Sequence, residues 1–171
     1  MRRLPLLLVG LVALCSCSYH LSGRRDVPSM HVSLCPPSGW THRWDAGKLV
    51  FEPIDWSDLR GPKPHILVIR MDTEDELTSA MRKDLKDQLR KSPNFTKIRT
   101  GAYIKGREEV EGFHIWEYDG PQGIRMRVYR RYYYWQPGII IVEIRGSKGF
   151  WSRNATMLAE FISKIQFMEE E

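Results

Sequence analysis

Residues 109–146 read "EVEGFHIWEYDGPQGIRMRVYRRYYYWQPGIIIVEIRG", and this stretch decides the fold. It holds three runs rich in aromatic and β-branched residues, and the turn residues at 119–123 and 136–138 separate them. Runs of this kind joined by short loops with Gly and Pro are typical of antiparallel hairpins. Together with a similar run at 95–105, they predict a four-stranded antiparallel meander.

Strand alternation places basic and aromatic side chains together on one face of this meander. Such a strip could face a partner, for example an anionic polymer or phospholipid headgroups. It could equally be an ordinary solvated face whose charges pair across the strands. The strip consists of Arg125, Arg127, Tyr129, Arg131, Tyr133 and Trp135.

The strand register favours the self-paired face. If both turns close symmetrically, Glu117 lies opposite Arg125, and Arg131 lies between Glu111 and Glu143. Opposite charges at such positions stabilise a sheet by roughly 0.2 to 1 kcal/mol each. The side chains that alternate to the opposite face of these strands are then the expected core: Trp116, Ile124, Met126, Val128, Tyr132, Val142 and Ile144.

Outside the meander, the sequence predicts further strands and two helices. Apolar runs at 48–54 and 65–71 are strand candidates, and a short strand precedes the turn at Pro36. The sequence 73–76, "TEDE", resembles a capping box and predicts a helix from Thr73, with an apolar stripe every fourth residue from Leu77 to Leu89. In the last segment, Trp151, Ala155, Leu158, Ala159, Ile162 and Ile165 recur at helical spacing.

These elements predict an α+β fold, a mostly antiparallel sheet covered by helices. The composition, 42% hydrophobic and 27% charged, fits one globular domain over residues 30–171. The net charge of +5 is too small to indicate nucleic acid as a partner.

The N-terminus, "MRRLPLLLVGLVALCSCSYH", resembles a bacterial lipoprotein signal peptide. In Leu14-Cys15-Ser16-Cys17, a large aliphatic residue and a small residue precede Cys17 at the positions that a lipobox requires. We therefore expect residues 1–16 to be removed, Cys17 to carry the lipid, and residues 17–29 to form a tether. An ordinary signal peptide with cysteines by chance is the alternative.

Removal of residues 1–16 and lipidation of Cys17 predict where the protein lies in the cell and leave it with one free thiol. The lipid on Cys17 anchors the chain to a membrane of the cell envelope, and Ser18 in place of Asp mildly favours the outer membrane. Cys35 then remains, and its place at the end of an apolar strand predicts burial rather than a disulfide.

Catalytic and metal-binding patterns are scarce. The five histidines are scattered, with no pair at the spacing of a zinc site, and phosphate loops and nucleophile elbows are missing from the sequence. We expect no cofactor, no metal and no catalytic residue, and therefore no enzyme.

The order of elements resembles the fold shared by photosystem PsbP proteins, the Ran-binding Mog protein and DcrB-type bacterial lipoproteins. The resemblance covers residues 30–168. It rests on the turn Pro37, Gly39, Trp40, on Gly112 with Phe113, and on a terminal helix that closes with Ile165 and Phe167. It implies a non-catalytic α/β/α sandwich.

Two functions are compatible with these observations. The first is a membrane-anchored envelope module that binds another protein or supports assembly of a complex, and it is the one we favour. The second is a carrier of a small ligand, or a weak enzyme, with a pocket between sheet and helix.

Overall fold

The computed structural model describes residues 20–57, 61–105, 108–135 and 138–168. Its centre is a seven-stranded antiparallel sheet in the order β3-β4-β5-β9-β8-β7-β6. A three-stranded sheet in the order β1-β2-β10 lies beside it. The strands are β1 Arg25–Val27, β2 Val32–Leu34, β3 Trp40–Asp45, β4 Lys48–Pro53, β5 His65–Asp72, β6 Thr96–Lys105, β7 Glu108–Asp119, β8 Arg125–Trp135, β9 Gly138–Ser147 and β10 Gln166–Phe167.

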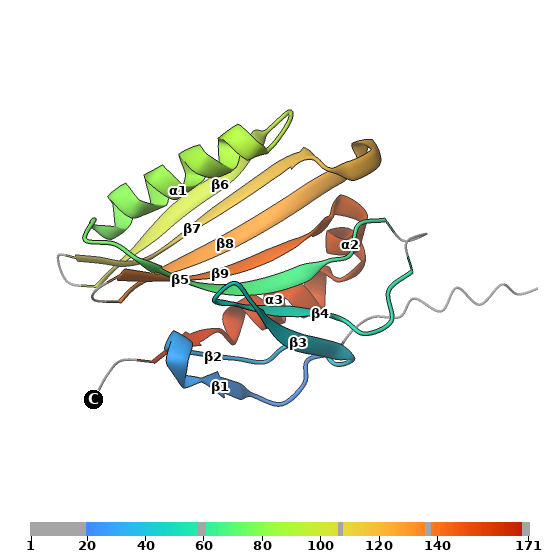
Figure 1. The fold of residues 1–171 in the computed structure, drawn as a ribbon, viewed down its shortest axis with the longest axis horizontal. Coiled ribbons are helices and arrows are strands. Elements are labelled where there is room, and N and C mark those ends of the chain that lie inside the picture. Colours follow the sequence, from blue (N-terminus) through green and yellow to red (C-terminus); the bar gives the residue numbers. More distant parts are fainter. Residues whose placement is uncertain (1–19, 58–60, 106–107, 136–137, 169–171) are drawn as a thin grey trace, which may run out of the picture.

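Helices cover both faces of the large sheet (Figure 1). One face carries α1, and the other carries α2, α3 and the small sheet (Figure 1). This is the α+β arrangement that the sequence predicts, an antiparallel sheet between helical layers. The helices are α1 Leu77–Lys91, α2 Lys148–Arg153 and α3 Ala155–Ser163, with short 3-10 turns η1 Pro28–Met30 and η3 Pro121–Gly123.

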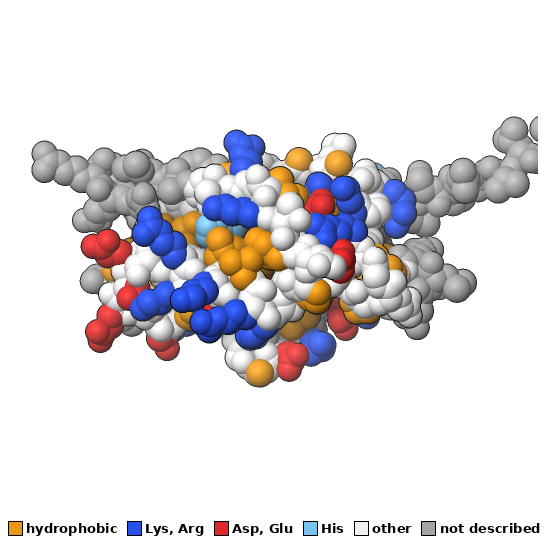
Figure 2. All heavy atoms as spheres, turned by 90° about the horizontal axis from the view of Figure 1, so that it is seen from above, with side chains coloured by type: hydrophobic (Ala, Val, Ile, Leu, Met, Phe, Trp, Pro, Cys, Tyr) orange, Lys and Arg blue, Asp and Glu red, His pale blue; other side chains and the backbone are white. Residues whose placement is uncertain are grey.

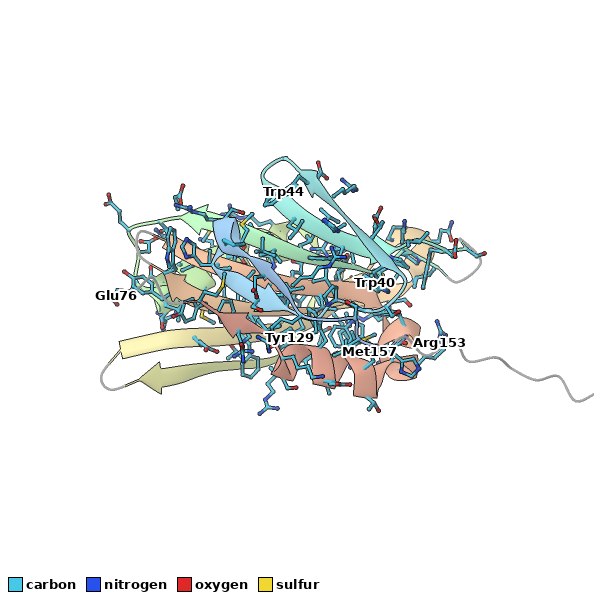
Figure 3. The ribbon with its side chains drawn as sticks, turned by 90° about the horizontal axis from the view of Figure 1, so that it is seen from below. Trp40, Trp44, Glu76, Tyr129, Arg153 and Met157 are labelled. Carbon is cyan, nitrogen blue, oxygen red and sulfur yellow. The ribbon has the colours of Figure 1, made fainter. Side chains whose placement is uncertain are left out.

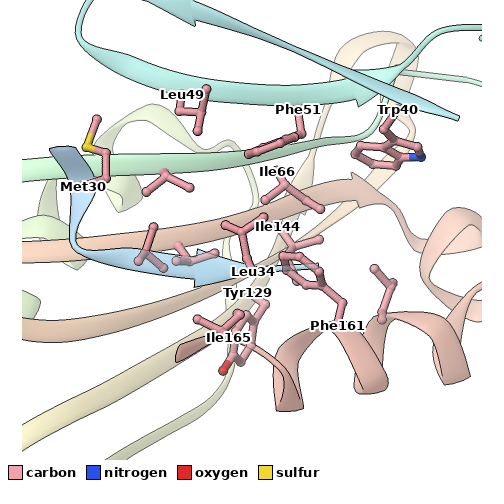
Figure 4. Packing of buried hydrophobic residues seen from close by; sticks show 14 of the residues in the cluster. Met30, Leu34, Trp40, Leu49, Phe51, Ile66, Tyr129, Ile144, Phe161 and Ile165 are labelled. Atoms are coloured by element: carbon pink, nitrogen blue, oxygen red, sulfur yellow. The ribbon is translucent and has the colours of Figure 1, made fainter. Parts of the chain in front are cut away.

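The larger core lies between the seven-stranded sheet and the layer of α3 and β2 (Figure 4). Val32 and Leu34 of β2, Ile144 of β9 and Phe161 of α3 are fully buried there. A smaller core beneath α1 joins Leu77 and its neighbours to Tyr132, Ile139 and Ile141. Cys35 is buried at the end of β2, as expected.

The predicted capping box at Thr73 is wrong. The helix begins at Leu77, and the Thr73 hydroxyl accepts from the backbone N–H of Asp75, at 3.1 Å, instead of capping the helix. A short Thr side chain that bonds two residues ahead stabilises a turn and delays the helix. The apolar stripe is therefore buried at Leu77 and Met81, whereas Leu89 is exposed.

The terminal segment is two helices instead of one. The chain leaves helical geometry at the buried Asn154, whose side-chain N–H donates to the carbonyl of Phe150 at 2.9 Å. This break rotates the buried face, so Ala155 and Ala159 are exposed. The residues facing the core are Phe150, Met157, Leu158, Phe161 and Ile165.

The two ends of the domain also differ from expectation. Residues Arg25–Val27 are a strand paired with β2, so the described part of the expected tether belongs to the domain. Phe167 lies in β10, beyond the end of α3, and pairs with Val32. Leu21 and Val27 pack on the larger core, and the burial of such apolar side chains favours pairing over a free linker.

Candidate protein-binding surface

The basic and aromatic strip of β8 lies beneath α3 and β10 rather than on an open surface. Tyr129, at its centre, belongs to the larger core, and Figure 3 shows it on the side that carries Met157 of α3. Arg131 donates to the carbonyl of Ile162 in α3 at 3.1 Å. Tyr129 is buried, so the expectation of a solvated strip is wrong at its centre. The other side chains of the strip are half-buried.

The C-terminal end of the strip stacks on neighbouring aromatic rings. Tyr133 stacks on Phe167 with ring centroids 4.5 Å apart, and Trp135 stacks on His31 at 4.3 Å. The guanidinium of Arg70 lies 4.2 Å from the ring centroid of Trp135. These contacts attach the small sheet and β5 to the strip.

The charges of the strip are paired, as expected from the sequence. Glu117 binds Arg127 at 2.7 Å and Arg125 at 3.5 Å, and Glu111 binds Arg131 at 2.6 Å. Burial by itself would raise the pKa of Glu117, but the hydrogen bond and charge of Arg127 outweigh it and lower that pKa.

The register nevertheless differs from symmetric closure of the two turns. Glu117 lies opposite Arg127, so the bond to Arg125 is a diagonal one. On the next strand, Trp135 pairs with Gly138, which shifts β9 by one residue and places Glu143 opposite Arg130. The predicted pair of Glu143 with Arg131 is therefore wrong, because a one-residue slip moves each side chain to the other face.

Glu143 instead enters a buried charged network beneath α1. Arg130 bridges Glu143 and Asp84 of α1, and the Tyr132 hydroxyl donates to Asp84 at 2.7 Å. Arg145 binds the second oxygen of Glu143 at 2.8 Å. Burial opposes ionisation of Glu143, yet the positive charge of Arg130 holds the pKa of that carboxyl well below its usual range.

This network fits a structural role better than a chemical one. Glu143 has no exposed surface, and Arg130 is 5% exposed, so solute has no direct access to either group. Packed side chains such as Met81 and Ile141 also occupy the space beneath α1 where a ligand carrier would hold its ligand. Among the residues described, no three His, Cys, Asp or Glu side chains gather as a metal site.

Unpaired positive charge collects instead on α1 and β6. Residues 77–105 contain eight Lys and Arg but two Asp, so they supply more net positive charge than the whole chain carries. Asp84 is engaged by Arg130, and Asp87 by Arg90. Among the described side chains of α1 and β6, the exposed basic ones left without an acidic partner are Arg82, Lys86, Lys91, Lys97 and Arg99.

Two exposed apolar residues lie where α1 passes into β6. Leu89 is 40% exposed and Ile98 is 47% exposed. Figure 2 shows this side of the molecule, with Lys and Arg side chains around a hydrophobic area. We define the α1–β6 surface by Arg82, Lys86, Leu89, Lys91, Lys97 and Ile98.

Strand β6 also forms one edge of the seven-stranded sheet. A sheet edge presents backbone N–H and C=O groups that can pair with another chain. The surface thus combines charge, apolar area and an edge. The excess of basic residues in 77–105 was visible in the sequence, but the position of their acidic neighbours was not.

Comparison with solved structures identifies the fold. Cyanobacterial PsbP (CyanoP) from Synechocystis is similar with a TM-score of 0.62 and 12% identity, over 95% of this chain and 99% of that one. The Ran-binding protein Mog1p of Saccharomyces cerevisiae is similar with a TM-score of 0.60 and 9% identity, over 89% and 97%. The chain has the PsbP/Mog1p-like fold.

A third structure with the PsbP/Mog1p-like fold is LpqN of Mycobacterium tuberculosis, which is involved in cell envelope biogenesis. Its TM-score is 0.58 at 12% identity, over 81% of this chain and 83% of that one. No family model and no curated protein sequence matches the chain. At such low identity the likeness establishes the PsbP/Mog1p-like fold alone, and this fold is compatible with a non-catalytic binding module.

Proposed function

We propose that this protein is a lipid-anchored module of the bacterial envelope that binds an acidic protein partner through the α1–β6 surface. The observation that carries the proposal is the cluster of basic side chains without acidic partners around Leu89 and Ile98. The module performs no chemistry itself and acts by holding its partner near the membrane.

The anchoring half of the proposal rests on the N-terminal sequence. Cys17 is preceded by Leu14 and Ser16, as a lipobox requires, and it lies outside the described residues. The described part of the chain contains no helix long and apolar enough to cross a membrane. The envelope role of LpqN and the Ran binding of Mog1p support a binding module of this fold at the envelope. Ser18 favours the outer membrane.

The binding half follows from charge and desolvation. A partner that offers carboxylates to Lys86 and Lys97 gains attraction without first breaking an ion pair of this chain. Burial of Leu89 and Ile98 at the centre of the contact adds the apolar contribution, since exposed apolar side chains are driven out of water. Binding should weaken as salt rises, because rim charges are screened over about 8 Å at physiological ionic strength.

Site-specific photo-cross-linking in the native cells tests this surface. A photoreactive residue at position 89 or 98 should capture one envelope protein, whereas the same residue at the exposed Thr156 of α3 should not. The double reversal Lys86→Glu, Lys97→Glu should abolish capture. Reversal of the exposed Arg153 on α2 is the matched control and should leave it intact. Equal capture at positions 89 and 156, or capture insensitive to the double reversal, would rule the surface out.

The anchor is tested separately. Cys17→Ala should move the protein from the membrane fraction to the soluble fraction, and the wild-type N-terminal peptide should carry the mass of a lipid. An unmodified Cys17 in membrane-bound protein would contradict the lipid anchor.

A further inference from the structure

The link between Cys17 and the folded domain is much shorter than the sequence suggests. The carbonyl of His20 accepts from the N–H of Ser38, Leu21 bridges to Pro37, and the N–H of Ser22 donates to Pro36 at 2.7 Å. Only Ser18 and Tyr19 therefore lie between Cys17 and the paired chain. Three residue steps span at most about 10 to 11 Å, so a lipid on Cys17 holds this side of the domain against the bilayer.

The side of the domain near this link carries its most exposed apolar residues. Ile54 is 62% exposed, and its N–H donates to Gly39, the neighbour of Ser38, at 3.0 Å. Trp44 is 56% exposed near the tip of the β3–β4 hairpin, and Figure 3 shows it at the edge of the molecule. Both residues belong to or adjoin this one hairpin.

Arg25 contacts the hairpin between these two points, and Arg24 lies beside it in the chain. Arg25 of β1 bonds to His42 of β3 at 2.9 Å, which brings β1 beside the hairpin two residues before Trp44. Arg24 and Arg25 are exposed, and within the described ranges their bonds are to Ser33, Gln166 and His42, not to a carboxylate. Residues 20–48 hold four Lys and Arg, and Asp26 and Asp45 oppose them, so the region keeps a positive charge.

We propose that the anchor-side surface, formed by Arg24, Arg25, His42, Trp44 and Ile54, lies on the membrane and contacts anionic lipid headgroups. The proposal rests on lipid attachment at Cys17. Tryptophan suits the bilayer interface because its ring is apolar and its N–H is polar, and arginine is attracted to anionic headgroups. A membrane is favoured over a protein as the occupant because the short link leaves little room for a protein between the domain and the bilayer.

This contact would fix the orientation of the whole module. The small sheet and β3 lie on the opposite side of the molecule from α1 (Figure 1). When the anchor-side surface rests on the bilayer, the α1–β6 surface therefore points away from it and stays open to a partner.

Spin-label accessibility on the full-length lipidated protein tests the contact. The label is placed at position 45, next to an intact Trp44, or at the exposed Lys86 of α1, in a Cys35→Ala background. The protein is reconstituted in vesicles of phosphatidylethanolamine and phosphatidylglycerol. We expect a label at position 45 to be shielded from a water-soluble nickel reagent and a label at position 86 to remain accessible.

Charge reversal sharpens the test. Arg24→Glu with Arg25→Glu should lower the ratio of shielded to accessible label at position 45 by about fivefold or more for each reversed charge, and phosphatidylcholine vesicles should also lower this ratio. Arg82→Glu on α1 is the matched control and should leave nickel access at position 45 unchanged. Equal nickel access at positions 45 and 86 in protein whose N-terminal peptide carries lipid would overturn the orientation and leave the anchor standing. A peptide without lipid would instead overturn the anchor, and the orientation with it.

Discussion

Glu143 has no exposed surface, although its pKa is held low and it carries a charge. Burying a charge is costly unless a partner compensates it, and Arg130 provides that compensation from the neighbouring strand. Arg130 also binds Asp84, so this one guanidinium joins α1 to the centre of the sheet. The pair therefore specifies how α1 lies on the sheet.

Replacing Arg130 should be one of the most damaging single changes in the molecule. Arg130→Met leaves Asp84 without its cation and the buried Glu143 with only one of its two arginines, Arg145, and we expect the free energy of unfolding to fall by about 3 to 5 kcal/mol. Urea denaturation measures this loss. Arg43→Met is the control, because Arg43 and Asp45 form an exposed pair, 3.1 Å apart, whose loss should cost under about 1 kcal/mol. Similar losses in the two variants would contradict the assigned role of Arg130.

His114 should make stability depend on pH. Desolvation, with the nearby charge of Lys97, lowers the pKa of His114 from 6.5 to about 4 in the folded protein. The unfolded chain then binds the proton more readily than the folded one, so stability is full above pH 6.5 and falls as the pH drops toward 4. The loss should approach about 3 kcal/mol when it is complete.

Urea unfolding at a series of pH values tests this expectation. Carboxylates such as Glu117, with a lowered pKa, lose their contribution only below about 4.5, so the range from pH 6.5 to 4.5 reports His114. His114→Phe, which keeps an aromatic ring beside Tyr132, should flatten the curve in that range. An unchanged slope in the variant would show that another group titrates there.

At the scale of single elements, alternation and turn residues were reliable guides. The meander strands and the strands at 48–54 and 65–71 form where the sequence predicts them. The predicted facing of the β9 side chains was wrong because Trp135 pairs with Gly138. This pairing leaves two residues in the loop, whereas symmetric closure of the turn requires three. Local sequence does not reveal that difference, since Gly and Pro suit turns of either length.

Gly138 permits the close approach of β5 and β9. A Cβ at this position would lie 2.4 Å from the backbone oxygen of Met71, which cannot move aside as a flexible side chain can. Gly138→Ala should therefore lower the free energy of unfolding by about 1 to 3 kcal/mol. Thermal unfolding, followed by circular dichroism, measures it.

Gly23→Ala is the matched control for this substitution. A Cβ at Gly23 meets no atom within 4 Å, so we expect a change within about 0.5 kcal/mol. If Gly138→Ala leaves the free energy of unfolding unchanged, β5 and β9 separate more easily at this position than their pairing implies.

At the scale of the whole molecule, the domain begins earlier than residue 30. A chain starting at residue 20 should be more stable than one starting at residue 28, because the shorter chain loses β1 and the packing of Leu21 and Val27 on the core. We expect a lower midpoint of thermal unfolding for the shorter chain. Equal midpoints would mean that residues 20–27 add no stability to the domain and belong to the tether.

The fold class was predictable from the sequence, but the candidate surfaces were not. Glu117 and Arg125 form the expected pair although the actual register of β7 and β8 differs from the predicted one by two residues, because diagonal neighbours on a sheet still reach each other. By contrast, whether Lys86 has an acidic partner, or Trp44 a covering layer, depends on elements distant in sequence. A count of charges along the sequence could have pointed to the basic segment at 77–105, but only the packed structure separates its paired from its unpaired side chains.

The small sheet has a mechanical consequence. The chain enters β1 beside Leu34 and leaves β10 beside Val32, and both strands pair antiparallel to β2 between them. Tension applied between residues 20 and 168 would pull β1 and β10 in opposite directions along their length, which loads the interstrand hydrogen bonds in shear rather than peeling them one by one. Pulling through residues 20 and 168 in an optical trap should give one abrupt rupture, and gradual peeling would contradict this geometry. The load path crosses three short strands and leaves the seven-stranded sheet, with the proposed α1–β6 surface, unstressed.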